Sequence, residues 1–205
     1  MRGIAAIDNI SLIVALVALI LVLTLYVILY HKLWHRTRKS RIPVHSGVVV
    51  VDGSNVAFHR VGKGKGKIRN ILIVLRSLEK KGFDVKIVVD ASLRYRIDNP
   101  NILEKLVREG KIIQAPPGTP ADYFILKLAE DLNAAVISND MYRDWWREFP
   151  WARGTGKIIR YVIEGKRAYF YPDIYPTHRV KRKHKKTEEE EEYLETSDHE
   201  LPRYM

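Results

Sequence analysis

The sequence contains no cysteine in 205 residues. This absence excludes disulfide bonds, zinc sites built from thiolates and a cysteine nucleophile, so any metal ion must bind through oxygen atoms or imidazole. Two nucleotide-binding signatures are absent as well. The stretch Gly62–Lys67 alternates glycine and lysine, but its spacing fits neither the Walker loop nor the dinucleotide fingerprint.

Acidic residues are in deficit relative to basic ones. The chain has 35 Lys and Arg residues against 24 Asp and Glu residues, which gives a formal net charge of +11 at pH 7. A positive charge of this size favours a polyanionic partner or an anionic membrane surface, although it says nothing about the fold. The length suits one domain of ordinary size with accessory segments.

One long hydrophobic run follows a short N-terminal segment, residues 1–9. Residues 10–30 carry no charged side chain, and as a helix they would measure roughly 31 Å, which matches a hydrocarbon core of about 30 Å. The apolar region of a cleaved signal peptide is shorter, about 7–15 residues. A core helix of a soluble protein is the other alternative. We predict a transmembrane helix over residues 10–30.

Basic residues crowd the C-terminal side of this run. Five lysines and arginines lie between residues 31 and 46, whereas residues 1–9 carry only Arg2 and Asp8 as charged side chains. By the positive-inside rule, the part of the chain that follows the helix is cytoplasmic. We therefore expect a single-pass membrane protein with a basic juxtamembrane linker, residues 31–46, and a cytoplasmic C-terminal domain.

Strand and helix patterns alternate through residues 47–175. This alternation predicts an α/β fold with a parallel sheet and helices on both faces. The expected strands are 48–51, 85–89, 111–114 and 134–137, the expected helices are 68–81, 100–108, 120–132 and 141–147, and a closing hairpin is expected over 157–163 and 167–171. Residues 176–205 turn polar, with a basic and then an acidic run, and we expect a charged, disordered tail.

Three of the expected strands lead into an aspartate, namely Asp52, Asp90 and Asp140. In a doubly wound sheet, chemistry collects outside the carboxyl ends of the strands, near the point where the strand order reverses. Carboxylates that converge there raise one another's pKa and cost free energy unless a cation neutralises them. A hard metal ion that prefers oxygen ligands is the natural partner for such a cluster.

Each aspartate also has a purely structural explanation. Asp122 could complete a capping box at a helix start, Asp140 could cap the next helix, and Asp52 before a glycine could form a turn. The joint pattern is harder to explain in this way, because caps require neither Asn55 nor Asp144. In a helix, Asp144 would share one face with Asp140. Metal binding is the interpretation that covers the whole set.

Three motifs carry a resemblance to a known family. They are Asp52-Gly53-Ser54-Asn55, the helix start Ala121-Asp122-Tyr123-Phe124, and Ser138-Asn139-Asp140. In this order and spacing, residues 48–171 resemble the NYN/PIN-like ribonucleases, in particular the Zc3h12a-like (Regnase-type) branch. The resemblance implies a PIN-like, Rossmann-like fold and a Mg²⁺ or Mn²⁺ site formed by Asp52, Asn55, Asp122 and Asp140, with Asp144 as a further acidic residue.

The chain departs from the family pattern in two respects. Ala121 stands where the family often has a second aspartate, and the cysteine-rich zinc finger of some members is absent. The resemblance implies an endoribonuclease acting on single-stranded RNA, and because PIN-like domains commonly pair, it also allows a homodimer. A metal-bound water suits such phosphodiester hydrolysis, although the motif spacing itself does not distinguish RNA from DNA.

Two other functions stay open. A catalytically weak PIN-like module that binds RNA or recruits a partner at the membrane would share the same motifs. A metal-dependent phosphatase has less support, because its nucleophilic Asp-x-Asp motif is missing: the second residue after Asp52 is Ser54.

Several basic residues are candidates for contacts with RNA phosphates. Three lie in a glycine-rich loop that could equally be a solvated loop, and three lie near the expected catalytic edge. They are Lys63, Lys65 and Lys67, and Arg94, Arg96 and Arg143. Trp145, Trp146 and Trp151 are candidates for stacking on bases, although core packing is the commoner use of tryptophan beside a short helix.

Overall fold

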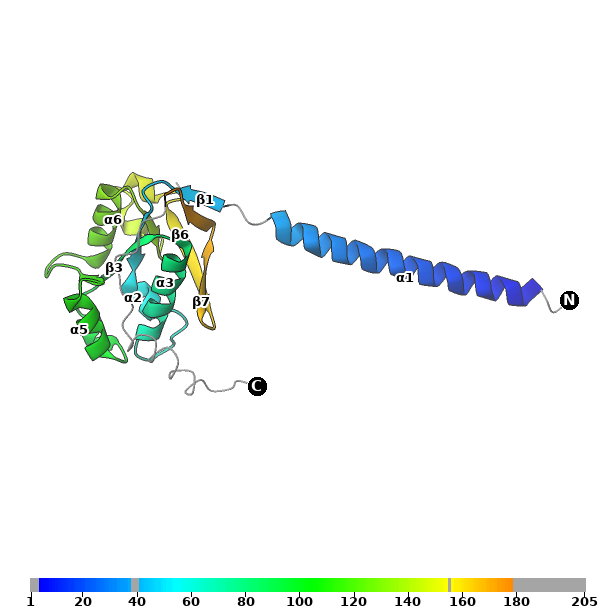
Figure 1. Ribbon diagram of the computed structural model, residues 1–205, viewed down its shortest axis with the longest axis horizontal. Helices are drawn as coiled ribbons and strands as arrows, with labels where there is room; N and C mark the ends of the chain where they lie inside the picture. The colour runs from blue at the N-terminus through cyan, green and yellow to red at the C-terminus, as the bar shows by residue number, and fades with distance from the viewer. Residues whose placement is uncertain (1–3, 38–40, 155, 179–205) are drawn as a thin grey trace. The chain divides into compact units, whose positions relative to one another are not determined.

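The computed structural model describes residues 4–37, 41–154 and 156–178. The chain divides into two compact units, residues 1–40 and residues 41–205. The first unit contains the helix α1 (Ile4–Thr37), and the second contains all the described strands (Figure 1).

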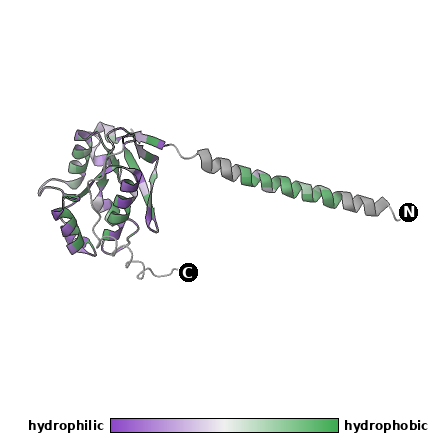
Figure 2. Cartoon of the chain, viewed as in Figure 1, coloured by the Kyte–Doolittle hydropathy of each residue, from purple (hydrophilic) through white to green (hydrophobic). Residues whose placement is uncertain are grey.

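Helix α1 is 34 residues long. Its part from Leu12 to Leu29 is long and apolar enough to cross a membrane, by length and composition, and none of it is buried. Figure 2 shows this part as a continuous hydrophobic stretch. The helix continues to Thr37, so residues 31–37, predicted as the first part of a linker, are helical.

The second unit is built on a six-stranded sheet with the order β4-β3-β2-β5-β6-β7. The first five strands are parallel to one another, and β7 pairs with β6 as an antiparallel hairpin. The strands are β2 (Val48–Asp52), β3 (Asp84–Val89), β4 (Ile112–Gln114), β5 (Ala135–Ile137), β6 (Ile158–Glu164) and β7 (Arg167–Tyr171). The predicted parallel α/β sheet is confirmed.

Helices cover both faces of this sheet because its strands are apolar on both sides. In β2, Val49 and Val51 pack into the core that contains α3 (Ile68–Lys81) and α5 (Pro100–Arg108). The residue between them, Val50, packs into the core of α6 (Ala121–Asp131) on the opposite face. Alternate residues of a strand point to opposite faces, so an unbroken run of valines supplies both cores.

The strand order reverses beside β2. From β2 the chain moves to β3 and β4 on one side, and it then crosses to β5 on the other side of β2. The carboxyl ends of β2 and β5 therefore flank the crevice in which doubly wound proteins bind their ligands. Asp52 ends β2, and Ser138, Asn139 and Asp140 follow β5 directly.

The helix predicted over residues 141–147 is wrong. The structure has only a short 3-10 turn, η1 (Arg143–Trp145), and the residue before it, Tyr142, has a φ of 49°. A residue in this left-handed region cannot continue a right-handed helix. Asp140 and Asp144 therefore do not share a helix face, and that part of the argument for their pairing fails.

A small second sheet was not expected from the sequence. Strand β1 (Arg41–Val44) pairs in parallel with β8 (Asp173–Pro176), although residues 41–44 fall in the predicted linker. The Arg41 guanidinium lies 3.3 Å from the Asp173 carboxylate, and Lys81 of α3 also pairs with Asp173. Strand β1 therefore belongs to the folded unit.

The remaining short elements precede or follow the longer ones. They are α2 (Gly53–Ala57), α4 (Leu93–Arg96) and η2 (Pro150–Ala152). Most of the predicted tail, residues 179–205, lies outside the described residues, so its disorder stays a prediction.

Candidate active site

An open pocket of about 420 Å³, here called the acidic pocket, lies at the carboxyl ends of β2 and β5. Its walls come from the turn after β2, the first turn of α6, the segment after β5 and the middle of β6. The structure brings four of the predicted catalytic residues into this one pocket, although they are far apart in the sequence. They are Asp52, Asn55, Asp122 and Asp140.

Asp52 is buried at the bottom of the pocket and held by three hydrogen bonds. Its Oδ1 accepts from the Asn55 backbone N–H at 2.9 Å, and its Oδ2 accepts from the hydroxyls of Ser138 and Tyr142, both at 3.0 Å. Burial raises the pKa of Asp52, and the nearby charge of Asp140 adds to this effect, against the three hydrogen bonds. The carboxylate is thus oriented rigidly but is costly to ionise.

Asp122 lies across the pocket, in the first turn of α6. Its pKa is raised by partial burial and by the charges of Asp52, Asp140 and Asp144, while a hydrogen bond from Trp145 opposes the rise. Asp144 is exposed and does not line the pocket, yet it is close enough to act on Asp122. Mutual repulsion of this kind is the electrostatic condition that a bound cation relieves.

Asn55 presents a hydrogen-bond donor to the pocket. Its Oδ1 accepts from the Asn139 backbone N–H at 3.1 Å and from the Tyr161 hydroxyl at 2.9 Å. Because a backbone N–H can only donate, this contact fixes which end of the amide is oxygen. The amide NH₂ is then the group of Asn55 that is left to serve a ligand.

Three residues to which the sequence analysis assigned no role in the site hold it together. Ser138 and Tyr142 orient Asp52, and the side chain of Asn139 exchanges two 3.1 Å hydrogen bonds with the backbone of Tyr161. Burial raises the pKa of Tyr142, so its hydroxyl stays protonated and continues to donate. Ser138 belongs to the third motif and Tyr142 follows it, but only the folded structure shows that their hydroxyls point at Asp52.

Comparison with known proteins identifies the family. The family model described as the Zc3h12a-like ribonuclease NYN domain matches residues 46–189. The chain belongs to this family. The resemblance seen in the sequence is therefore confirmed, and the acidic pocket lies in an NYN ribonuclease domain.

Two solved structures were found to be similar to this chain, and the first of them shares the fold of the NYN domain. The crystal structure of nuclear proteinaceous RNase P 2 from A. thaliana is similar with a TM-score of 0.50 at 20% sequence identity, covering 62% of this chain and 30% of that chain. A second structure, of Arabidopsis thaliana nuclear protein-only RNase P 2, has a TM-score of 0.48 at 18% identity, covering 82% of this chain and 37% of that chain. The chain thus spans about a third of the length of either protein.

The donor set of this NYN domain suits a small hard cation, although it is incomplete. Among the described residues, no three acidic or histidine side chains lie close enough together to hold a metal ion by themselves. One reason is that Asp52 turns both oxygens toward Asn55, Ser138 and Tyr142. Mg²⁺ commonly binds through only one or two carboxylates, several waters and the phosphates of its substrate. The carboxylates around this pocket fit that pattern.

Of the other predicted residues, the structure brings Arg96 to the acidic pocket. Its guanidinium lies over the Phe58 ring, 5.4 Å from the centroid. Asp90 lines a separate hollow with Arg94. Hydrogen bonds from the Ser92 hydroxyl and from the Ser92 N–H, the latter at 2.7 Å, lower the pKa of Asp90. The structure therefore does not place Asp90 with the other acidic residues.

The remaining basic candidates lie outside the pocket. Lys63, Lys65 and Arg143 are exposed. Lys67 pairs with Asp98 at 3.6 Å, and Arg94 pairs with Glu104 at 3.2 Å. Their proposed contacts with RNA stay predictions.

The tryptophans pack against the core. Trp145 and Trp151 make ring contacts with Tyr123 and Phe149, and the Trp146 indole donates to the Met141 carbonyl at 3.0 Å. All three pack beside the core of α6, which favours the structural interpretation over stacking on bases.

Lowering the pH should stabilise the metal-free acidic pocket. Because the pKa values of Asp52 and Asp122 are raised in the folded protein, the folded state binds protons before the unfolded chain does. Their contribution to the free energy of unfolding therefore increases as the pH falls through these raised values, and it levels off below the ordinary carboxyl pKa. Urea denaturation in EDTA at pH 7 and pH 5 measures this change.

The variant Asp52→Asn isolates the effect of one carboxyl group from all others. The stability difference between variant and wild type should shrink as the pH falls, because wild-type Asp52 becomes neutral as well. A difference that stays constant when the series is extended from pH 7 to about pH 4, near the ordinary pKa of an aspartate, would contradict the raised pKa.

Proposed function

We propose that this NYN domain is a metal-dependent endoribonuclease that hydrolyses phosphodiester bonds of single-stranded RNA, and that α1 anchors it in a membrane. One observation carries the enzymatic part. Asp52, Asp122 and Asp140 come from three separate segments and line a single open pocket, at the point where the strand order reverses. Burial and mutual repulsion of these carboxylates favour a bound cation.

Asp52, Asp122 and Asp140 are the residues that would hold Mg²⁺ or Mn²⁺. When bound, such an ion lowers the pKa of a coordinated water and polarises a phosphoryl oxygen. Asp140, which lines the acidic pocket, would orient the attacking water, and Asp144 outside the pocket would act through its charge on Asp122.

Two hydrogen-bond donors that line the acidic pocket are suited to hold the phosphate. The Asn55 NH₂ group and the Arg96 guanidinium are hydrogen-bond donors only, and the Arg96 fork suits a phosphate. Arg96 donates to the Ser92 hydroxyl at 3.1 Å, which positions this fork. The acidic residues and the donors of this pocket together favour a phosphodiester over a neutral substrate.

A closed circular single-stranded RNA tests whether cleavage is internal. The protein should linearise the circle in Mg²⁺ or Mn²⁺ and leave it intact in EDTA, because an endonuclease needs no free end. Gel electrophoresis of the circle beside a linear RNA of the same sequence reads the result. Degradation of the linear RNA alone would indicate an exonuclease instead.

A catalytically weak module that binds RNA is the second candidate. It is favoured by the lack of a complete group of metal ligands among the described residues and by Ala121, which leaves one acidic residue at the start of α6. Under this alternative the wild-type protein would bind single-stranded RNA but cleave neither the circular nor the linear RNA in Mg²⁺, Mn²⁺ or EDTA.

The membrane anchor is proposed from the exposure of α1. The large hydrophobic side chains from Leu12 to Leu29 are between 49% and 68% exposed. Such a surface is unfavourable in water and favourable in lipid. The full chain should stay with the membrane pellet after carbonate extraction. The double variant Val17→Arg with Leu21→Arg should be released, because each arginine costs roughly 2.5–3.5 kcal/mol in mid-membrane. Release of the wild type would contradict anchoring.

A further inference from the structure

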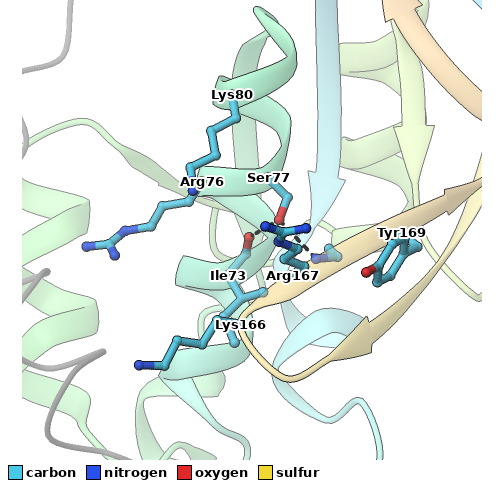
Figure 3. Close-up of a pocket in the computed structure, with 8 residues that line it drawn as sticks. Ile73, Arg76, Ser77, Lys80, Lys166, Arg167 and Tyr169 are labelled. Carbon is cyan, nitrogen blue, oxygen red and sulfur yellow. Dashed lines mark hydrogen bonds between the residues drawn. The ribbon is translucent and has the colours of Figure 1, made fainter.

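A second hollow, here called the basic pocket, lies between α3 and the β6–β7 hairpin and has a volume of about 360 Å³ (Figure 3). Four of its lining residues are cationic and none is acidic. Arg76 and Lys80 come from α3, and Lys166 and Arg167 come from the hairpin. Nothing in the sequence pattern connects these two pairs, because roughly a hundred residues separate them.

Arg76 is the residue that most clearly lacks a partner. Its Nε and Nη2 atoms are buried without a hydrogen-bond acceptor among the described residues. In the same part of the chain, neither Lys80 nor Arg167 forms an ion pair; Glu164 is the ladder partner of Arg167 but does not line the pocket. Buried N–H groups without acceptors cost free energy, and an anion in the basic pocket would offset the positive charge that Arg76 shares with the other three cations of the lining.

The basic pocket is held in shape by Ser77. Its hydroxyl donates to the Ile73 carbonyl at 2.7 Å and accepts from the Ala168 N–H at 2.9 Å, as the dashed lines in Figure 3 show. These two bonds attach the hairpin to α3. The cations are therefore presented by a rigid wall on each side, which suits recognition of a single phosphate by a guanidinium fork.

One pair of neighbouring residues in the β6–β7 ladder connects the basic pocket with the acidic pocket. His59 lines the acidic pocket and accepts a 3.3 Å hydrogen bond from the Ile163 N–H. In the β6–β7 ladder, Ile163 is the direct partner of Ala168, which lines the basic pocket. The two pockets therefore lie on neighbouring parts of the domain.

The outer face of β7 adds exposed aromatic rings beside the basic pocket. Residues of β7 alternate between exposed and buried, so Arg167, Tyr169 and Tyr171 share the outer face. The two tyrosines are 43% and 56% exposed, and Tyr169 also lines the pocket. Cations that track a backbone beside rings that can stack on bases are typical of single-stranded nucleic-acid binding.

We propose that the basic pocket binds a backbone phosphate of the single-stranded RNA substrate, away from the scissile bond, with an adjacent base stacked on Tyr169. The proposal rests on the proposed ribonuclease function for its choice of ligand. An anionic lipid headgroup would satisfy the same cations, but the exposed rings and the short path to the acidic pocket favour RNA.

RNA affinity measured without cleavage tests the proposal. The full chain in nanodiscs of zwitterionic lipid is titrated into a fluorescent single-stranded RNA in EDTA, at several salt concentrations. Arg167→Gln and Arg76→Gln should each weaken binding by about tenfold, as expected for loss of a charge-assisted contact. Each should also reduce the slope of log K against log salt by about 0.7. Tyr169→Ala should weaken binding without changing this slope.

Lys86→Gln is the matched control, because it removes one charge from β3 outside both pockets, and its affinity should stay near that of the wild type. An equal loss in the control would show that only net charge matters and would overturn the proposal. Arg167 is the safer variant if the partly buried Arg76 proves essential for folding, which circular dichroism checks.

The outcomes separate this proposal from the proposed function. If the wild type binds RNA and both arginine variants bind equally well, the basic pocket is not an RNA site, while the ribonuclease assignment is unaffected. If the wild type binds no RNA, the result contradicts both the basic-pocket proposal and the proposed ribonuclease function. Repeating the titration in nanodiscs with phosphatidylserine tests the lipid alternative: RNA binding that is lost there for the wild type but kept by Arg167→Gln would assign the pocket to lipid.

Discussion

Asp52→Asn should lower RNA cleavage by more than about 100-fold and, at the same time, stabilise the metal-free protein. Loss of an outer partner of a metal ligand already costs about 10–100-fold, and Asp52 would itself be a ligand. Asn keeps the size of the side chain and one acceptor for the Asn55 N–H, whose present bond is 2.9 Å. The hydroxyls of Ser138 and Tyr142 can accept from the new amide.

The gain in stability has a separate cause. Burial makes the Asp52 carboxylate costly to ionise and raises its pKa, so a neutral side chain removes that cost from the folded state. A gain of about 1 kcal/mol would appear as a rise in Tm of about 2–4 °C for a chain of this size. Differential scanning calorimetry in EDTA measures it, beside single-turnover cleavage in Mg²⁺.

Asp131→Asn provides the matched control for this experiment. Asp131 is an exposed residue of α6 that pairs with Lys127 at 2.9 Å, and its loss should leave both cleavage and Tm near the wild-type values. An Asp52→Asn protein that unfolds more easily than the wild type in EDTA would show that Asp52 is a structural cap rather than a strained catalytic group.

Gly53→Ala should destabilise the fold by about 1–3 kcal/mol, the usual range for overpacking a core. A Cβ at this position would lie 2.7 Å from Val89 Cγ1, 2.8 Å from Ile87 Cγ2 and 2.9 Å from the Val88 carbonyl oxygen. The last of these is backbone of a central strand and cannot move aside. Because Gly53 follows Asp52 directly, relief of the clash should also displace Asp52 and reduce cleavage.

Gly62→Ala is the control for Gly53→Ala. A Cβ at Gly62 would have no neighbour within 4 Å, so this change should be neutral or slightly stabilising through its effect on the unfolded chain. Urea denaturation of the two variants in EDTA compares them directly. Equal stabilities would show that β3 is looser around Gly53 than the structure indicates.

The parts of the fold that were predictable are those with a strong local period. Helix α3 follows from apolar residues at helical spacing and from Gly82, which ends it with a φ of 97°. The helix expected after Asp140 failed because the left-handed backbone of Tyr142 is not visible in a periodic pattern. Strand β1 was missed because it is four residues long, contains Pro43 and lies in a basic stretch.

The candidate site was predictable in its carboxylates but not in their support. Asp52 and Asp140 are found from the sequence because each follows a strand at the edge where topology brings residues together, whereas Asp122 is found through the family resemblance. The role of Tyr161 depends on a hydrogen bond to Asn55 across 106 residues, and the basic pocket depends on two elements that meet only in the folded chain. Such contacts leave no local pattern.

Metal dependence of cleavage is the most direct test of the account. The measurement is the initial rate of cleavage of a single-stranded RNA by the full chain as a function of Mg²⁺ concentration, for the wild type and for Asp122→Asn. The wild-type rate should saturate with Mg²⁺, vanish in EDTA and return when Mg²⁺ is restored, while Asp122→Asn should need at least about tenfold more Mg²⁺. Cleavage that persists in EDTA, or that responds identically in both proteins, would contradict a metal site at the acidic pocket.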